Sequence, residues 1–204
     1  MGSITKLFES VEKLNFIPPI VKFKWETTIF NCLKDDVLTS LKNPNSKDLK
    51  STLVGRIRQG KQIELKTNLF STLAEVGNIY GHTLISNYVD QSFKIHELPW
   101  IVLQKSGDYN PLHAHDGFLT VITYIKVPAS IGKINPDDRQ DLNFNLDGWL
   151  TFVGSETYLG IKPVEGEGYI FPSNLRHMVY PYTDNEDRIS ISWNLIKGDN
   201  NAHA

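Results

Sequence analysis

Residues 187–195 read Asp-Arg-Ile-Ser-Ile-Ser-Trp-Asn-Leu, and apolar and polar side chains alternate along this stretch. Alternation with a period of two predicts a β-strand that buries one face in a core. Two isoleucines and a tryptophan make the apolar face, whereas Arg188, Ser190 and Ser192 share the polar face. In a barrel whose polar face points inward, these three side chains line the interior.

A pattern typical of β-strands continues through the whole second half of the chain. From Pro99 onward, short apolar runs are separated by turn residues, at 100–104, 118–127, 148–153, 158–161, 168–171, 177–180 and 188–195. This spacing favours an antiparallel sandwich or barrel over alternating β and α units.

The first half predicts supporting elements rather than a second domain. We expect a strand at 20–30, a short helix that begins after Asn31 as its N-cap, and the longest helix at 69–89. The polar segment 134–147, with Asp137, Asp138, Arg139 and Asp141, predicts a loop at the barrel mouth. The expectation is one α+β, mainly β domain over 1–204. Residues 1–95 would pack helices on one sheet, and 96–197 would form the barrel core.

Composition narrows the function classes. The 204 residues carry a formal net charge of -2, which gives no electrostatic case for nucleic acid or an anionic membrane as partner. Cys32 is the only cysteine, so an intrachain disulfide and a thiolate metal cluster are excluded. No apolar run approaches the roughly 18 residues of a membrane span. The first 16 residues also lack the apolar stretch of a signal peptide. These features predict a cytoplasmic protein.

Three of the six histidines suggest a metal site. His113 and His115 are two residues apart, so on an extended backbone both imidazoles point to the same face. His177 enters from a distant strand, after the turn residues Phe-Pro-Ser-Asn. A His-x-His pair with a remote third histidine is a common metal-ligand set in β-barrels. Alternatively, the pair are surface histidines near a turn, and His177 is an unrelated hydrogen-bonded residue.

Arg188 lies 11 residues past His177 on the polar strand face. A guanidinium beside a hydroxyl is suited to a bidentate grip on a carboxylate, which would make Arg188 and Ser190 an anion-binding pair. The competing interpretation is a surface ion pair between Arg188 and one of the nearby acidic residues, which are Asp184, Glu186 and Asp187.

Taken in order, these segments resemble the iron(II)- and 2-oxoglutarate-dependent oxygenases on the prolyl-hydroxylase-like side. The resemblance covers Trp100 to Leu195, and it is closest to a group of small, largely uncharacterised oxygenase-like proteins with a His-x-His motif. The matching pieces are Gly107-Asp-Tyr-Asn-Pro-Leu-His113, Leu119-Thr-Val-Ile-Thr-Tyr124, Gly148-Trp-Leu-Thr-Phe152, the Pro-Gly-Phe run from Lys162 to Ser173, His177, and Arg188-Ile-Ser190.

The resemblance implies a double-stranded β-helix, the jelly-roll fold also seen in cupins. It also implies Fe(II) and the cosubstrate 2-oxoglutarate, with hydroxylation of a prolyl peptide, another peptide or a small molecule and release of succinate and CO2. Arg188, Ser190 and Tyr124 would bind 2-oxoglutarate, and Tyr109 has a weaker claim beside the alternative of an aromatic residue packed at the mouth. Asn110 and Asn194 are further candidates for the pocket wall.

The chain departs from the superfamily pattern at one ligand. The usual second ligand is an aspartate or glutamate two residues after the first histidine, and here that position is His115. Either three histidines bind the metal, or a bulge or the Asp116-Gly117 turn brings the Asp116 carboxylate into the site.

Two rival functions come from other classes. A cupin-like three-histidine enzyme that does not use 2-oxoglutarate predicts Arg188 in a surface salt bridge. A non-catalytic barrel that serves as a binding module predicts three widely separated histidines.

Overall fold

The structure is a computed structural model that describes residues 6–132 and 146–198. Its elements follow the order β1 (Phe8–Leu14), β2 (Ile20–Trp25), α1 (Thr27–Lys42), β3 (Lys61–Glu64), α2 (Phe70–Leu84), β4 (Phe93–Gln104), β5 (Asn110–His113), β6 (Leu119–Lys126), β7 (Leu150–Val153), β8 (Tyr158–Ile161), β9 (Glu167–Pro172), β10 (His177–Val179) and β11 (Arg188–Lys197). The predicted loop at 134–147 falls almost entirely outside the described residues.

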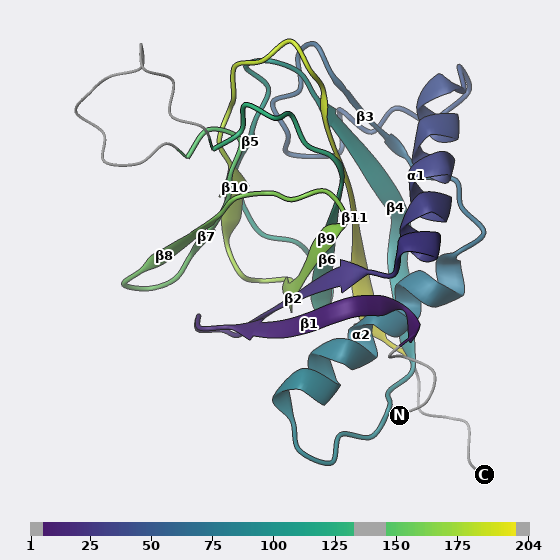
Figure 1. The fold of residues 1–204 in the computed structure, drawn as a ribbon, viewed down its shortest axis with the longest axis vertical. Coiled ribbons are helices and arrows are strands. Elements are labelled where there is room, and N and C mark those ends of the chain that lie inside the picture. The colour runs from purple at the N-terminus through teal and green to yellow at the C-terminus, as the bar shows by residue number, and fades with distance from the viewer. Residues whose placement is uncertain (1–5, 133–145, 199–204) are drawn as a thin grey trace.

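Two antiparallel sheets face each other (Figure 1). The larger has the order β1-β2-β9-β6-β11-β4-β3, and the smaller has the order β5-β10-β7-β8. The first half, where the only predicted strand is 20–30, extends the larger sheet at both edges. β1 pairs with β2, which joins β9, and β3 joins β4. This is the mainly β jelly-roll predicted from the sequence.

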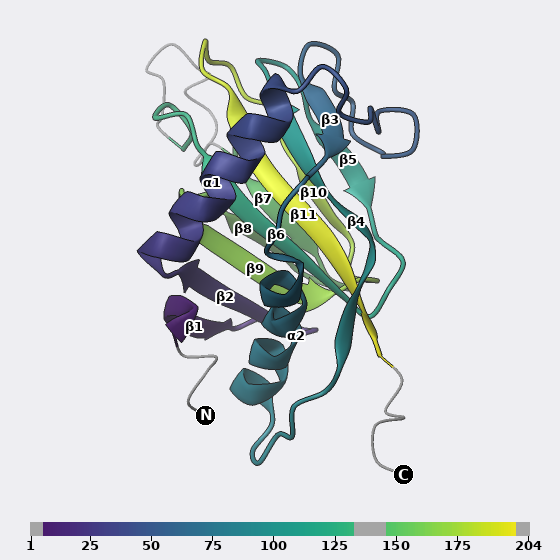
Figure 2. The same ribbon diagram turned by 90° about the vertical axis from the view of Figure 1, so that its right-hand side faces the viewer.

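Both helices cover the outer face of the larger sheet (Figure 2). The core between them contains Leu33 and Val37 of α1, Leu73 of α2, and Ile191 and Trp193 of β11. The apolar face of β11 therefore meets the helices, and the Trp193 indole donates a 3.1 Å hydrogen bond to the Leu73 carbonyl. The polar face of β11 is left to point between the two sheets, as the alternation predicts.

Both helices differ in extent from the prediction. α1 begins at Thr27 rather than after Asn31, because the Glu26 carboxylate caps it by accepting the Thr28 and Ile29 N–H groups. The strand predicted to reach residue 30 accordingly ends at Trp25.

α2 ends at Leu84, five residues before its predicted end, so α1 is the longer helix by one residue. After α2 the chain turns back and packs the Tyr88 ring over Gly81, where even a methyl group would clash. The Asn78 amide then exchanges hydrogen bonds with the Gln91 backbone, which holds the reversed chain against the helix.

Neither described helix has the length and apolar character needed to span a bilayer.

Candidate active site

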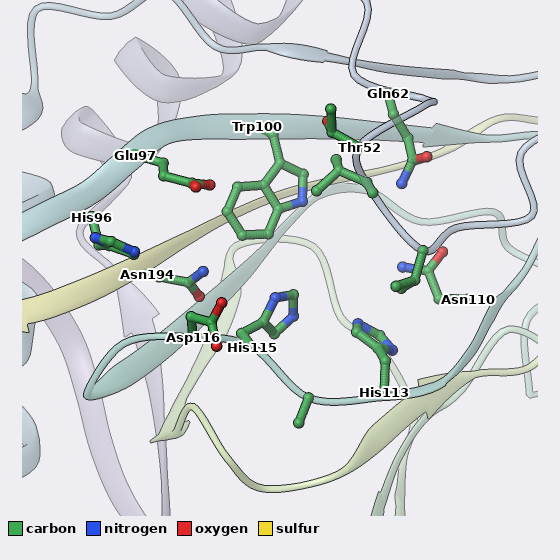
Figure 3. Close-up of a pocket in the computed structure, with 13 residues that line it drawn as sticks. Thr52, Gln62, His96, Glu97, Trp100, Asn110, His113, His115, Asp116 and Asn194 are labelled. Atoms are coloured by element: carbon green, nitrogen blue, oxygen red, sulfur yellow. The ribbon is translucent and has the colours of Figure 1, made fainter.

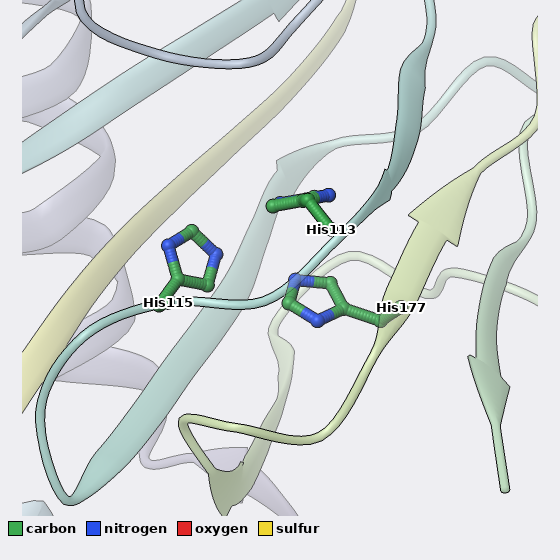
Figure 4. Close-up of side chains that lie close together, drawn as sticks. All are labelled: His113, His115 and His177. Carbon is green, nitrogen blue, oxygen red and sulfur yellow. The ribbon is translucent and has the colours of Figure 1, made fainter.

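Two of the three histidines are brought together by strand pairing. His113 is the last residue of β5 and His177 the first of β10, and the two residues are direct partners in the antiparallel register. Their ring centroids lie 4.3 Å apart (Figure 4). A single strand pair of the smaller sheet therefore brings together two residues that lie far apart in the sequence.

His115 reaches the same place from the loop that follows β5. Its backbone N–H donates a 2.9 Å hydrogen bond to the carbonyl of Ser173, in the turn that leads to His177. The Ser173 N–H in turn donates to the Phe118 carbonyl, and the Thr120 hydroxyl donates to the Ser173 hydroxyl. The Phe-Pro-Ser phrase noted in the sequence thus fixes the loop of the His-x-His pair.

The three imidazoles form one group whose potential ligand atoms all lie within 4.8 Å of one another. The Nδ1 atoms of His113 and His177 contact the carbonyl oxygens of Pro111 and Leu175, at 2.7 and 2.9 Å. A carbonyl accepts, so each of these Nδ1 atoms carries the proton and leaves Nε2 free as a neutral metal ligand.

The electrostatic environment keeps these imidazoles neutral, which is the form that binds a metal. Burial, together with the neighbouring His113, lowers the pKa of His177 to about 3. Burial and the same neighbour lower the pKa of His115 to about 4. Burial also lowers the pKa of His113. Three neutral nitrogen donors in a buried, polar corner fit a divalent transition metal such as Fe(II).

Asp116 does not join this group. Its side chain is exposed and lines the wall of a more open pocket next to His115 (Figure 3). Gly117, with φ +114°, makes the sharp turn from this point into β6. Of the two alternatives for the second ligand, the structure therefore brings His115 to the site and leaves Asp116 outside it.

A narrow inner cavity of about 30 Å³ extends from the three histidines to Arg188. Arg188 is only 2% exposed, and its guanidinium donates to the Gln104 side-chain carbonyl. Its Nε atom has no hydrogen-bond partner, and no carboxylate pairs with it among residues 6–132 and 146–198. Burial lowers the pKa of Arg188, although arginine keeps its proton in proteins. A buried, uncompensated cation is costly unless an anion joins it.

Tyr124 and Ser190 stand beside that cation. They are direct partners on β6 and β11, and both line the inner cavity. The Tyr124 ring lies 4.9 Å from the guanidinium carbon, and its buried hydroxyl has no hydrogen-bond partner. Burial raises the pKa of Tyr124, so the hydroxyl keeps its proton and can donate a hydrogen bond to a bound acceptor.

The acidic neighbours of Arg188 are engaged elsewhere. Asp187 pairs with Lys105 at 3.8 Å and Glu186 with Lys126 at 3.3 Å. The surface ion pair considered for Arg188 is therefore excluded, and so is the wide separation of the histidines that a binding module predicts.

Residues 99–194 match the family model described as "Putative 2OG-Fe(II) oxygenase". The matched segment contains all three histidines, Tyr124 and Arg188. This segment is similar to the 2OG-Fe(II) oxygenase superfamily. This family implies an enzyme that uses Fe(II) and 2-oxoglutarate, as the resemblance predicts. A search of curated proteins finds no match.

Solved structures share the fold of this chain at low identity. A prolyl-4-hydroxylase from Pseudomonas putida is 14% identical, with 83% of this chain and 88% of that chain covered and a TM-score of 0.52. A prolyl hydroxylase from Trichoplax adhaerens, in complex with a hypoxia inducible factor peptide fragment, is 16% identical over 88% and 83% of the two chains, with a TM-score of 0.55. The non-heme alpha ketoglutarate dependent epimerase SnoN from nogalamycin biosynthesis is 11% identical over 87% and 76%, with a TM-score of 0.60.

The histidine group also borders a wider outer pocket of about 220 Å³ (Figure 3). His113, His115, Trp100 and Asn110 line both spaces, so the outer pocket and the inner cavity meet at the histidines. Asn194 lines the outer pocket as well. Sequence reasoning named both asparagines as candidates for the pocket wall.

The structure places Tyr109 elsewhere. Its side chain is 38% exposed and lines neither the inner cavity nor the outer pocket, and its backbone carbonyl accepts a hydrogen bond from the Arg56 N–H.

Sequence reasoning missed Gln62, Glu97 and Trp100, which also form the outer wall. The signal for Trp100 is its position at the start of the predicted strand 100–104, which forms the end of β4. The sequence gives no signal for Gln62 or Glu97. The pairing of β3 with β4 brings Gln62 to the pocket, and a bulge in β4 brings Glu97 there.

Proposed function

We propose that the protein is an Fe(II)- and 2-oxoglutarate-dependent dioxygenase that hydroxylates a C–H bond of a substrate, with succinate and CO2 as co-products. In this proposal His113, His115 and His177 hold the iron, and Arg188, Ser190 and Tyr124 hold the distal carboxylate of 2-oxoglutarate. The observation that carries it is the buried, unpaired guanidinium at one end of a cavity whose other end is three neutral imidazoles.

Each residue has a defined task in this proposal. The guanidinium offers its unpaired Nε, and the Tyr124 hydroxyl offers its free proton, so a carboxylate between them satisfies two buried donors at once. Iron, when bound, supplies the redox chemistry that activates oxygen, and the protein supplies geometry and water exclusion.

The three-histidine donor set alters the charge of the centre. A site of three imidazoles carries one negative charge fewer than the usual two histidines and a carboxylate. We therefore expect the iron to be held less tightly and the dianionic cosubstrate to contribute more of the neutralising charge.

The test is an anaerobic Fe(II) titration followed by 2-oxoglutarate, monitored by the weak visible charge-transfer band of the chelate and by thermal shift. We expect a band that grows to one equivalent of 2-oxoglutarate and a stabilised protein. A protein that binds Fe(II) but shows neither response to 2-oxoglutarate would favour the cupin-like alternative. A protein that binds neither would count against an enzyme of this class.

A further inference from the structure

Two carboxylates face the outer pocket without a partner. Glu97 and Asp116 line its wall on the side away from Asn110 (Figure 3). Neither forms a hydrogen bond or ion pair with any described residue, and the described lining residues include no lysine or arginine. Histidine is the only basic residue type in the wall. Such a concave wall concentrates cations.

A bulge in β4 puts Glu97 in this position. His96 pairs with Asn194 and Trp100 pairs with Ser192, so three residues of β4 oppose a single residue of β11. Within the bulge Glu97 has φ +64°, a conformation that is uncommon for a residue with a side chain. The fold thus departs from regular strand geometry at the residue that presents a carboxylate to the pocket.

Gln62 supplies an independent sign of a missing ligand. It is 1% exposed, points from β3 into the same pocket, and its Oε1 atom has no hydrogen-bond partner (Figure 3). The two amide positions differ only by a flip of the group, and either way the pocket contains a carboxamide with an unmet bond. A buried carbonyl without a donor is unfavourable. An N–H group of an occupant would satisfy it.

The Trp100 indole lies between Gln62 and Glu97 in this wall (Figure 3). Its ring contacts His115 with centroids 5.6 Å apart, so it also borders the metal-ligand group. An aromatic face beside carboxylates is a favourable environment for an organic cation that carries N–H donors.

We infer that the outer pocket binds a substrate that carries a positively charged group, an alkylammonium or guanidinium. Glu97 and Asp116 hold this group at one end of the wall beside Trp100, and the Gln62 carbonyl, on the other side of Trp100, accepts from a further N–H group of the same substrate. This inference rests on the proposed function, and it names the substrate class of that same site. The group belongs either to a free basic amino acid or to a lysine or arginine side chain in a peptide. Because His113 and His115 line the same pocket, a carbon next to that group lies beside the metal-ligand cluster.

The test measures affinity rather than turnover. The full chain is loaded with Zn(II) and 2-oxoglutarate, which gives no oxidation, and titrated by calorimetry with four cationic probes: L-lysine, L-arginine, and each as its N-acetyl N-methylamide. The N-acetyl N-methylamide of norleucine matches lysine without the charge, and that of glutamate reverses it. We expect at least one cationic probe to bind about tenfold more tightly than the norleucine probe, and the free and capped forms to show which source the pocket prefers.

Three variants link that preference to the named groups. Glu97→Gln and Asp116→Asn should each weaken the best cationic probe by roughly threefold to fivefold, as expected for exposed charge pairs, and the loss should shrink in high salt. Gln62→Met, which keeps the volume but removes the carbonyl, should weaken it as well. Glu75→Gln, on the exposed face of α2, removes one negative charge far from the pocket and should change nothing.

The outcomes separate this inference from the proposed function. Equal affinity for the lysine and norleucine probes, or a loss in Glu75→Gln as large as in Glu97→Gln, would overturn the inference. So would the failure of every cationic probe while 2-oxoglutarate binds normally. The same titrations on metal-free protein examine the pocket by itself, so a protein that binds the probes but not 2-oxoglutarate would keep the cation site and lose the proposed reaction.

Discussion

The inner cavity and the outer pocket meet at His113 and His115 but have different origins in the chain. Every residue that lines the inner cavity lies within the segment 99–194 that matches the oxygenase family. The outer pocket takes part of its wall from outside that segment, namely Thr52, Leu53, Val54, Gln62, His96 and Glu97. The inner cavity is narrow and has a buried cation in its wall, whereas the outer pocket is wider and bears carboxylates. The common chemistry is thus located in the shared core, and the features that can distinguish a substrate come largely from the N-terminal half.

The largest expected effect comes from removing one of the three histidines of the candidate metal site. His177→Ala should weaken divalent metal binding by about a hundredfold or more, because it removes one of the three histidine ligands of the candidate metal site. Binding is measured by calorimetry with Zn(II) or anaerobic Fe(II). His82→Ala, which removes a histidine of α2 that pairs with Asp90, is the matched control and should bind metal normally. Equal losses in the two variants would mean that the effect comes from the fold rather than from the site.

A second change affects the inner cavity alone. Arg188→Met should weaken 2-oxoglutarate binding by about thirtyfold or more, since a charge-assisted pair with a carboxylate contributes a few kcal/mol. The fold should tolerate the change, because the lost Gln104 contact is offset by removal of a buried unpaired charge. Metal affinity should stay within about twofold of the wild type. The control is Arg176→Met, at an exposed arginine, and unaltered 2-oxoglutarate affinity in Arg188→Met would contradict the assigned role.

A third change tests how the segment 58–60, next to the outer pocket, is attached to the core. The Asp108 carboxylate is 1% exposed and accepts backbone N–H groups of Arg58, Gln59, Gly60 and Lys105. Asp108→Ala leaves those donors unmet and should lower the free energy of unfolding by about 2–4 kcal/mol. Urea unfolding measures the loss, and hydrogen exchange at 56–60 should rise. An exchange increase that is uniform over the molecule would show that Asp108 does not hold this segment specifically.

Acid should destabilise the corner in the metal-free protein. Folding holds the pKa of His177 and His115 at about 3 and about 4, below the value of about 6.5 in an unfolded chain. The unfolded state therefore takes up more protons as the pH falls below 6.5. The stability that the neutral imidazoles provide is complete above that pH and is lost on the way down to the folded pKa values.

Between pH 6.5 and 5 the cost should be about 1–2 kcal/mol for each of these histidines. Urea unfolding with a chelator present measures it, and His115→Gln should flatten the slope. If this variant keeps the full pH dependence, the acid sensitivity arises at other groups.

The smallest expected effect concerns Tyr109. Since this ring lies outside the inner cavity, Tyr109→Phe should change 2-oxoglutarate affinity by less than about twofold, whereas Tyr124→Phe removes a buried donor and should cost about tenfold. Comparable losses in the two variants would restore the cosubstrate role that the sequence suggests for Tyr109.

Much of this arrangement could be predicted from sequence because it depends on local periodicity. Strand alternation placed Arg188 and Ser190 on the interior face of β11, and the run 158–161 coincides with β8. β1 was not predicted, because it is an edge strand whose residues are mostly exposed. Hydrogen bonds to β2, rather than burial, stabilise it.

The remainder required the tertiary structure. β3 has four residues, too few for a periodic pattern, and its Gln62 is buried only because β3 pairs with β4. The choice between His115 and Asp116 also lay beyond local pattern, since it is settled by the hydrogen bond from the His115 backbone to Ser173, far along the chain.

The carbonyls of Pro111 and Leu175 that orient His113 and His177 have a consequence for how the centre tolerates change. Many metal-binding histidines are oriented by a carboxylate side chain, which one mutation can delete. Here the orienting groups are peptide bonds, and every amino acid carries one. Substitutions at residues 111 and 175 can shift these acceptors but cannot remove them. The direction of each ring therefore does not depend on which side chains occupy residues 111 and 175.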